Sequence, residues 1–249
     1  MTMGTGTESG GTLERGAVRP GGMMPGALLL GIDTCGPEGS VALARAAGAA
    51  GVEIVGERAL AGRSYSATLV TAVRELLEAA GVGLGELEGI VAVNGPGSFT
   101  GVRVGLSAVK GLAEGQTARV VAVSRLEVLA AKAGAAGAAL DAHRNEVFLR
   151  LGKRELLAGR EELAAEKPEG AVAVCDDAAE TLLRSAWAEA ELVRVDAPTA
   201  SDALRLCAGR VAAGERVELA LLDGNYLRRS DAEIFGEAAG HEARGSGRA

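Results

Sequence analysis

Aromatic side chains are scarce in this sequence: three Phe, two Tyr and one Trp make up 2% of its 249 residues. The core must therefore be built from Ala, Val and Leu, which suits helices packed closely on a sheet. Few rings remain on which bases could stack. The net charge is -7, and no cluster of Lys and Arg is longer than the pair Arg228 and Arg229. The chain thus lacks the basic face that self-sufficient nucleic-acid binding needs, and a role on RNA would require a basic partner.

Cysteine and histidine are also few. The three cysteines, Cys35, Cys175 and Cys207, are far apart and form no CxxC spacing, which argues against a disulfide framework and a zinc site and is typical of a reducing cytosol. Of the two histidines, His143 and His241, the second falls in a polar Gly/Arg tail. We therefore expect a cytoplasmic protein with no metal centre of its own.

Long apolar runs are missing as well. No run of about 18 apolar residues occurs, so we expect no membrane span. The N-terminal stretch has no apolar signal-peptide core. We expect residues 1–26 to form a disordered extension and residues 236–249 a flexible tail. A further hypothesis is that Met23 or Met24 is the true translation start, which the intact mass of the native protein would test.

The residues that are present suffice for one large domain or two modest ones, since 48% of them are hydrophobic. Hydrophobic periodicity predicts an α/β fold that starts with three strands and continues helix, strand, helix, strand. These elements are expected at 27–33, 40–45, 51–60, 65–80, 89–94, 101–115 and 119–124.

After residue 124 a helix is expected at 125–134, and the order then begins again with a strand pair. The pattern predicts strands at 138–142, 146–151, 170–176 and 191–195, and helices at 160–166, 177–190 and 199–215. We interpret this as a duplicated fold with an abbreviated second copy that has fewer elements. The expected lobes are 27–124 and 125–235.

A glycine-rich loop follows the strand at 89–94. The sequence GPGSFTG holds Gly95, Gly97 and Gly101 in a GxGxxxG spacing, which fits neither the P-loop nor the dinucleotide fingerprint. Ser98 or Thr100 could cap the next helix. Such a helix start can bind an anion, or the loop can simply fix how the helix leaves the sheet.

Asp33 and Thr34, at the end of the first strand, are a second candidate. An Asp there, followed by a hydroxyl residue in a hairpin turn, is where actin-like enzymes hold Mg²⁺ and phosphates. Asp141 is its positional echo in the second half, next to His143 in a turn. Both carboxylates could equally cap turns. No Ser/His/Asp set can be assembled around His143.

The helices at 65–80 and 101–115 carry apolar stripes wider than one sheet contact requires. Such width is usual for core helices, and it is also what a helix-bundle interface between proteins looks like. The candidate interface residues are Leu69, Val70, Val73, Leu77, Val102, Leu106 and Val109.

The segment GPGSFTGVRVGLSAVKGLA resembles the signature of the TsaB family, also called YeaZ. LLGIDTCGPEGSVAL, ALDAHRNEVFLRL and GNYLRRSDAE resemble further segments of that family, so the resemblance covers roughly residues 28–234. The sequence departs from the family at Tyr65, where His is frequent, at Thr71, where Pro is frequent, and at His143 and Asn145, which replace a common Arg and Gly.

The resemblance implies a two-lobed actin/Hsp70/sugar-kinase (ribonuclease H-like) fold and a non-catalytic role in making threonylcarbamoyladenosine in tRNA. It implies docking through the helices at 65–80 and 101–115 onto TsaD, the catalytic paralogue, with the ATPase subunit TsaE as a third partner. We also expect a homodimer through the same face when TsaD is absent, and contact with tRNA only through the complex.

The chain has neither the HxxxH motif of TsaD nor a Gly-Gly pair after Gly22, so we expect no cofactor of its own, with ATP and Mg²⁺ used by the assembled complex. We therefore expect the loop at 95–101 mainly to fix how the next helix leaves the sheet, and only secondarily to bind an anion. The alternative is an active ATP-dependent small-molecule kinase that uses Asp33 and this loop.

Overall fold

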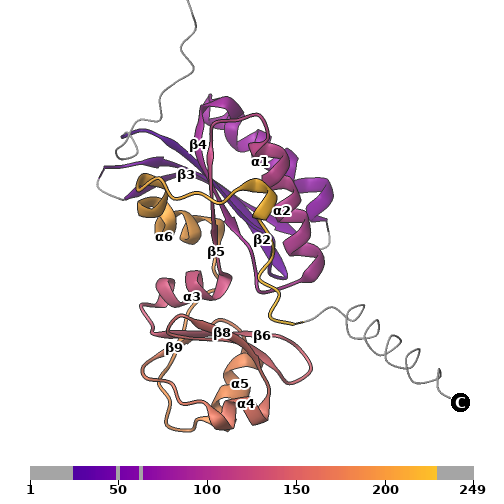
Figure 1. Cartoon of the computed structure of the whole chain (residues 1–249), viewed down its shortest axis with the longest axis vertical. Coiled ribbons are helices and arrows are strands. Elements are labelled where there is room, and N and C mark those ends of the chain that lie inside the picture. The colour runs from indigo at the N-terminus through magenta and orange to yellow at the C-terminus, as the bar shows by residue number, and fades with distance from the viewer. Residues whose placement is uncertain (1–24, 49–50, 62–63, 229–249) are drawn as a thin grey trace, which may run out of the picture.

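The computed structural model describes residues 25–48, 51–61 and 64–228. In this part of the chain two sheets lie one beyond the other along the long axis, each with helices packed on it (Figure 1). The expected extension up to residue 24, which includes Met23 and Met24, and the expected tail from residue 236 lie outside the described residues.

The first sheet has five strands in the order β3-β2-β1-β4-β5. Its central strand, β1, pairs antiparallel with β2 and parallel with β4. Every residue of β1 is buried, as expected for a strand covered on both faces. The bounds are β1 Leu28–Asp33, β2 Glu38–Ala46, β3 Val52–Ala61, β4 Leu87–Val93 and β5 Arg119–Val123.

Helices cover both faces of this sheet (Figure 1). On one face α1 lies against β2 and β3, α2 lies against β4, and the two helices contact each other. On the other face α6 contacts all five strands. Gly81, with φ +67°, ends α1 as the sequence predicts. The bounds are α1 Tyr65–Ala80, α2 Phe99–Ala113 and α6 Ala200–Ala212.

The second sheet repeats the first, with the order β10-β9-β6-β7-β8 and β6 in the place of β1. Here too the central strand pairs antiparallel with the strand that follows it and parallel with a later one. The strands are β6 Gly137–Asp141, β7 Val147–Leu151, β8 Arg154–Ala158, β9 Val172–Val174 and β10 Leu192–Arg194. The helices are α3 Arg125–Ala133, α4 Arg160–Ala165 and α5 Asp177–Ala186.

The prediction that the second copy has fewer elements is wrong. Each half runs strand, strand, strand, helix, strand, helix, strand, helix. The strand missing from the prediction is β8, which pairs antiparallel with β7 after a turn at Gly152. The abbreviation lies in length, since α4 has six residues where α1 has sixteen, and β9 and β10 have three residues each.

The last helix of each half packs on the sheet of the other half. α3, which follows β5, contacts β6, β7 and β9 of the second sheet, and α6, which follows β10, returns to the first sheet. Ala203, Leu204 and Cys207 of α6 accordingly belong to the core of the first lobe. The expected boundary, with 125–235 as the C-terminal lobe, does not anticipate this exchange. The architecture is the duplicated α/β fold of the actin/Hsp70/sugar-kinase (ribonuclease H-like) type.

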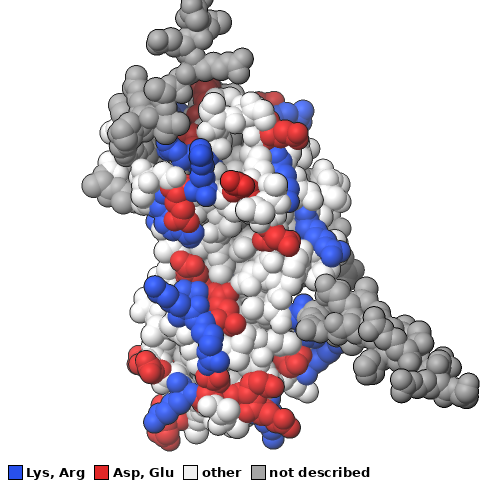
Figure 2. Space-filling view, in the orientation of Figure 1, with Lys and Arg blue, Asp and Glu red and all other residues white. Residues whose placement is uncertain are grey.

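Acidic and basic side chains are interspersed over the face shown in Figure 2, with broad uncharged areas between them. Among the helices of the described residues, none is both long enough and apolar enough to cross a membrane.

Candidate functional site

The glycine-rich loop connects β4 to α2 and is bonded to the turn between β1 and β2. The Gly95–Pro96 peptide bond is cis. Ser98 caps α2, because its Oγ accepts a hydrogen bond from the backbone N of Gly101 at 3.3 Å. The backbone N of Ser98 in turn donates to the carbonyl oxygen of Cys35 at 2.8 Å. Of the two predicted capping residues, Ser98 is therefore the one that acts.

Three glycines allow α2 to approach that turn at backbone distance. A Cβ on Gly97 would lie 2.2 Å from the carbonyl oxygen of Cys35, and one on Gly101 would lie 2.1 Å from the carbonyl oxygen of Thr34. A Cβ on Gly105 would lie 2.2 Å from the hydroxyl of Thr34. These positions exclude any larger residue, so the glycines serve the packing of α2 on the β1–β2 turn.

Asp33 is engaged inside the protein. The residue is 1% exposed, and its carboxylate accepts from the backbone N of Cys35 at 2.8 Å and faces Nε of Arg125 at 3.2 Å. Burial alone would lower the pKa of Arg125, but the Asp33 carboxylate, together with Cys35 and Cys175, outweighs burial and raises that pKa above its usual value. A charge that is neutralised in this way is poorly placed to hold a metal ion.

Thr34 is engaged as well. Its hydroxyl donates to the carbonyl oxygen of Gly101 at 2.7 Å and is buried. The structure therefore brings together the candidate residues for an anion or nucleotide loop, which are Asp33, Thr34, Gly95, Gly97, Ser98, Thr100 and Gly101, but the side chains of Asp33 and Thr34 bond to protein groups. Within the described residues no group of three or more His, Cys, Asp or Glu side chains could hold a metal ion.

Asp141 ends β6 as Asp33 ends β1, but its surroundings differ. Its Oδ1 accepts from the backbone N of His143 at 2.7 Å, and its Oδ2 lies 2.9 Å from Nδ1 of the same residue. His143, Arg144 and Asn145 all have positive φ values and form the turn to β7. Asp141 thus caps this turn, which is one of the two roles that the sequence left open.

The C-terminal segment covers the outer side of the loop. This segment was not assigned to any site from the sequence. The backbone N of Asn225 donates to the carbonyl oxygen of Asn94 at 2.7 Å, and the side-chain amide of Asn94 donates to the carbonyl oxygen of Asp223 at 3.3 Å. Tyr226 lies against Phe99, with 4.6 Å between ring centroids. The available signal was the resemblance of GNYLRRSDAE to a family segment.

The prediction that the apolar stripes of the two helices form an open interface is wrong for six of the seven candidate interface residues. Only Val70 is exposed, at 58%. The stripes are wide because α1 and α2 pack on the sheet and also on each other. The other six residues are buried in the core of the first lobe: Leu69, Val73, Leu77, Val102, Leu106 and Val109.

A shallow groove between α1 and α2 remains open on their outer side. Its volume is about 430 Å³, and Val70 lines it from α1. Val104 and Ala108 line it from α2, with Ser107 and Arg103 beside them. The outer surface of the helix pair is therefore apolar in its centre and polar at one side.

Comparisons with known proteins agree with this architecture. Residues 58–200 match a family model described as "TsaD: tRNA N6-adenosine threonylcarbamoyltransferase". YeaZ from Pseudomonas aeruginosa has a similar solved structure, with a TM-score of 0.64 and 29% sequence identity, covering 81% of this chain and 100% of that one.

Two curated relatives are named "tRNA threonylcarbamoyladenosine biosynthesis protein TsaB". The one from Haemophilus influenzae is 37% identical over 95 residues, which are 36% of this chain and 40% of the relative. The one from Escherichia coli is 34% identical over 116 residues, which are 43% of this chain and 50% of the relative. The matched region spans half or less of these relatives. Because the family model matches more than half of the chain, and because the named relatives and the solved structure agree with it, the chain belongs to the TsaB/YeaZ family of TsaD-related proteins.

Proposed function

We propose that this protein is a non-catalytic subunit of the machinery that makes threonylcarbamoyladenosine in tRNA, and that it docks onto TsaD. The names of its relatives support the process, and the match to the TsaD family model supports a partner of similar fold. In this role the docked subunit holds TsaD in a state competent to transfer the threonylcarbamoyl group to the adenosine beside the anticodon.

The observation that carries the docking proposal is the exposed apolar centre of the α1–α2 pair. Val70 is 58% exposed and lines the groove from α1, and Val104 and Ala108 line the same groove from α2. Uncovered apolar side chains with small neighbours and a polar margin are typical of a protein interface. A paralogue can present a similar helix pair, and two such pairs meeting face to face would form a helical bundle between N-terminal lobes.

A non-catalytic role is supported by the state of the loop. Asp33 is paired with Arg125, and Thr34 is bonded to Gly101. We propose that the chain uses no cofactor of its own, that the complex uses ATP and Mg²⁺, and that TsaE is the third subunit. We propose that tRNA is bound stably only by the assembled complex.

Co-purification of TsaD with the Val70→Asp variant tests the docking proposal. A buried carboxylate without a partner would oppose association, so we expect recovery of TsaD to fall at least about tenfold. The matched control is Val55→Asp, since Val55 is also exposed but lies on the edge strand β3. Unchanged recovery with Val70→Asp, or equal loss with Val55→Asp, would contradict the interface.

The predicted interface would suggest the variants Val73→Asp and Leu106→Glu. They are unsuitable because both side chains are buried, and a charge at either position would unfold the lobe. The same exposed face is the proposed contact of a homodimer when TsaD is absent. Size-exclusion chromatography of the isolated protein should then show a dimer that Val70→Asp shifts toward monomer.

The kinase alternative makes a different prediction. An active kinase would bind Mg-ATP tightly, and Asp33→Asn would abolish the binding. Calorimetric titration of the isolated protein with Mg-ATP measures this binding directly. We expect no tight binding, because the Asp33 carboxylate is already paired with Arg125.

A further inference from the structure

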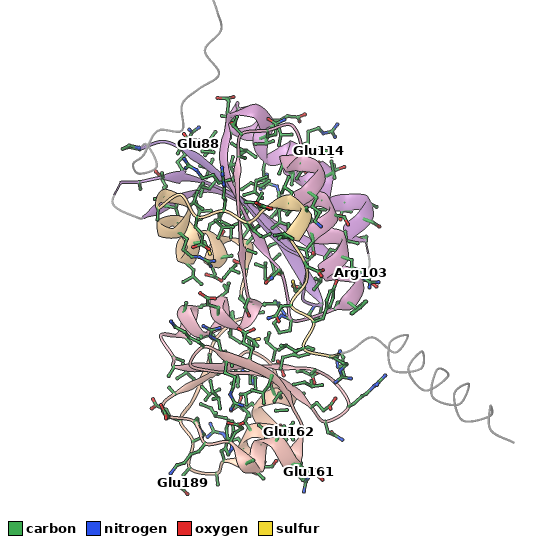
Figure 3. All side chains as sticks on the ribbon, viewed as in Figure 1. Glu88, Arg103, Glu114, Glu161, Glu162 and Glu189 are labelled. Atoms are coloured by element: carbon green, nitrogen blue, oxygen red, sulfur yellow. The ribbon has the colours of Figure 1, made fainter. Side chains whose placement is uncertain are left out.

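A second pocket lies on the other side of α2, between that helix and the C-terminal segment that includes η2, Leu219–Leu221. Its volume is about 360 Å³, within the range of small-ligand sites. Phe99, Arg103 and Lys110 line it from α2, and Asp223 and Tyr226 line it from the C-terminal segment. Figure 3 shows Arg103 at the end of α2 nearer to the second sheet.

The pocket holds an aromatic surface in a chain that has few aromatic residues. The rings of Phe99 and Tyr226 lie 4.6 Å apart at an interplanar angle of 39°, and Tyr226 is 37% exposed. The guanidinium of Arg103 lies 4.0 Å from the centroid of Phe99. An exposed ring that lies against a second ring, which itself contacts a guanidinium, is suited to stacking against a planar ligand.

Two cations, Arg103 and Lys110, also line the pocket. Among the described residues, no carboxylate forms an ion pair with Arg103 or Lys110, whereas Arg125, Lys132 and Arg150 are all paired. Arg103 and Lys110 are seven residues apart on one helix, which corresponds to about 10 Å along its axis. A ligand that reaches both must be an extended anion rather than a single small ion.

The carboxylate of Asp223 favours a nucleotide over a simple anion as the ligand of this pocket. One oxygen of its carboxylate accepts from the backbone N of Gly224 at 2.7 Å. A carboxylate repels a plain anion, but it accepts hydrogen bonds from the amino group of a base or from a ribose hydroxyl. A ring to stack on, cations for phosphate and an acceptor for N–H or O–H together match the chemistry of an RNA nucleotide.

We propose that this pocket binds an unstacked nucleotide of single-stranded RNA, with the base on Tyr226 and the flanking phosphates at Arg103 and Lys110. The charges of the visible surface are interspersed (Figure 2), so the contact is local and adds to the basic surface of a partner. The proposal rests on the proposed function only for the source of the RNA, which would be the loop of the tRNA substrate.

The test is fluorescence anisotropy of a labelled hexa-adenylate RNA titrated with the full chain at low salt. We expect Tyr226→Leu and Lys110→Glu each to weaken binding about tenfold, the size expected for loss of one stacked base or one phosphate contact. The matched control is Arg205→Glu, which makes the same charge change on α6, where Arg205 lies near Asp202 on the opposite face of the sheet. This control should bind the RNA like the unaltered chain.

Three results would overturn the proposal: no binding by the unaltered chain, an equal loss in Arg205→Glu, or displacement of the RNA by free AMP at the same concentration as by unlabelled RNA. Thermal unfolding of each variant checks that the fold is intact. Lys110→Glu should still co-purify with TsaD, and Val70→Asp should still bind RNA, since Lys110 and Val70 line different pockets. Failure of the RNA site is thus separable from failure of the docking proposal.

Discussion

At Gly105 the absence of a side chain decides how closely α2 approaches the β1–β2 turn. Because a Cβ there would meet the Thr34 hydroxyl at 2.2 Å, Gly105→Ala should destabilise the protein by about 1–3 kcal/mol through overpacking. Gly111, on the same helix, has nothing within 4 Å of the Cβ position, so Gly111→Ala should stabilise by about 0.5–1 kcal/mol. Urea unfolding measures both, and effects of the same sign would contradict the assigned role of Gly105.

The Asp33–Arg125 pair joins the end of β1 to the start of α3, and both side chains are buried. Arg125→Met leaves the Asp33 carboxylate buried without its partner and should cost about 3–5 kcal/mol. The double variant Asp33→Asn with Arg125→Met leaves no unpaired charge, so its loss should be smaller than the sum of the two single losses. A double-mutant cycle by chemical denaturation gives the answer, and strict additivity would mean that the pair is not coupled.

The residue types of the loop were predictable from the sequence, but their partners were not. Strand, turn, capping hydroxyl and helix follow from the order of Gly, Pro and Ser, and Ser98 does cap α2. Arg125 is 92 positions from Asp33, and only the path of β5 and α3 back past β1 brings them together. Local pattern therefore identifies a carboxylate at a strand end without showing what neutralises it.

At the scale of the element, hydrophobic periodicity located the helices well. α1 and α2 begin and end within about two residues of the predicted bounds. Periodicity reports which face of a helix is apolar, and it does not report what covers that face. This is why six of the seven predicted interface residues belong to the core, while the seventh, Val70, is exposed. β8 was not predicted because its charged residues, such as Glu155, which pairs with Arg150 of β7, obscure the alternation of apolar and polar residues.

The C-terminal segment bonds to both lobes, and Asn225 and Arg228 are the two side chains of the segment that bond to the second lobe. The amide of Asn225 donates to the Glu155 carboxylate of β8 at 2.6 Å, while its backbone bonds to Asn94 in the first lobe. Asn225→Ala removes one of these bonds, which should cost about 1–3 kcal/mol. We expect amide hydrogen exchange in residues 221–228 to become about tenfold faster for each 1.4 kcal/mol lost.

Arg154→Ala is the control for this variant, because Arg154 also lies on β8 but its ion pair with Glu166 stays within the second lobe. Exchange in residues 221–228 should not change there. If Asn225→Ala also left exchange in this segment unchanged, the segment would be held by its other contacts, which include the bonds of Arg228 to Ala142 and Glu146.

At the scale of the whole molecule, the duplication could be predicted from the sequence, but the exchange of helices between the lobes could not. The repeat of strand, Asp, turn and strand marks both halves. α3 and α6 are amphipathic whichever sheet they cover, so their sequences do not indicate a partner. Because each lobe takes its last helix from the other half, we expect the two lobes to unfold in one cooperative transition rather than one after the other.

Buried acids that stay neutral give this molecule a predictable response to alkaline pH. Burial raises the pKa of Tyr65 to about 12 and that of Cys207 to about 11, and burial with the nearby Asp33 carboxylate raises the pKa of Cys35 well above its usual value. Tyr65 keeps its proton while donating to the carbonyl oxygen of Gly36 at 2.8 Å. In the unfolded chain the same groups ionise near their ordinary values, about 10 for Tyr and about 8.5 for Cys.

The unfolded state therefore binds fewer protons than the folded state above about pH 8.5, and the free energy of unfolding must fall as the pH rises. The stability is complete below the unfolded values and is lost as the pH passes toward the folded values of about 11 and 12. Urea unfolding at a series of pH values from about 8 to 11 measures this slope. Cys207→Ala should flatten it, since that thiol no longer titrates, whereas Arg74→Ala, at an exposed ion pair with Glu78, should not. A slope unchanged by Cys207→Ala would mean that this thiol ionises as readily in the folded protein as in the unfolded chain.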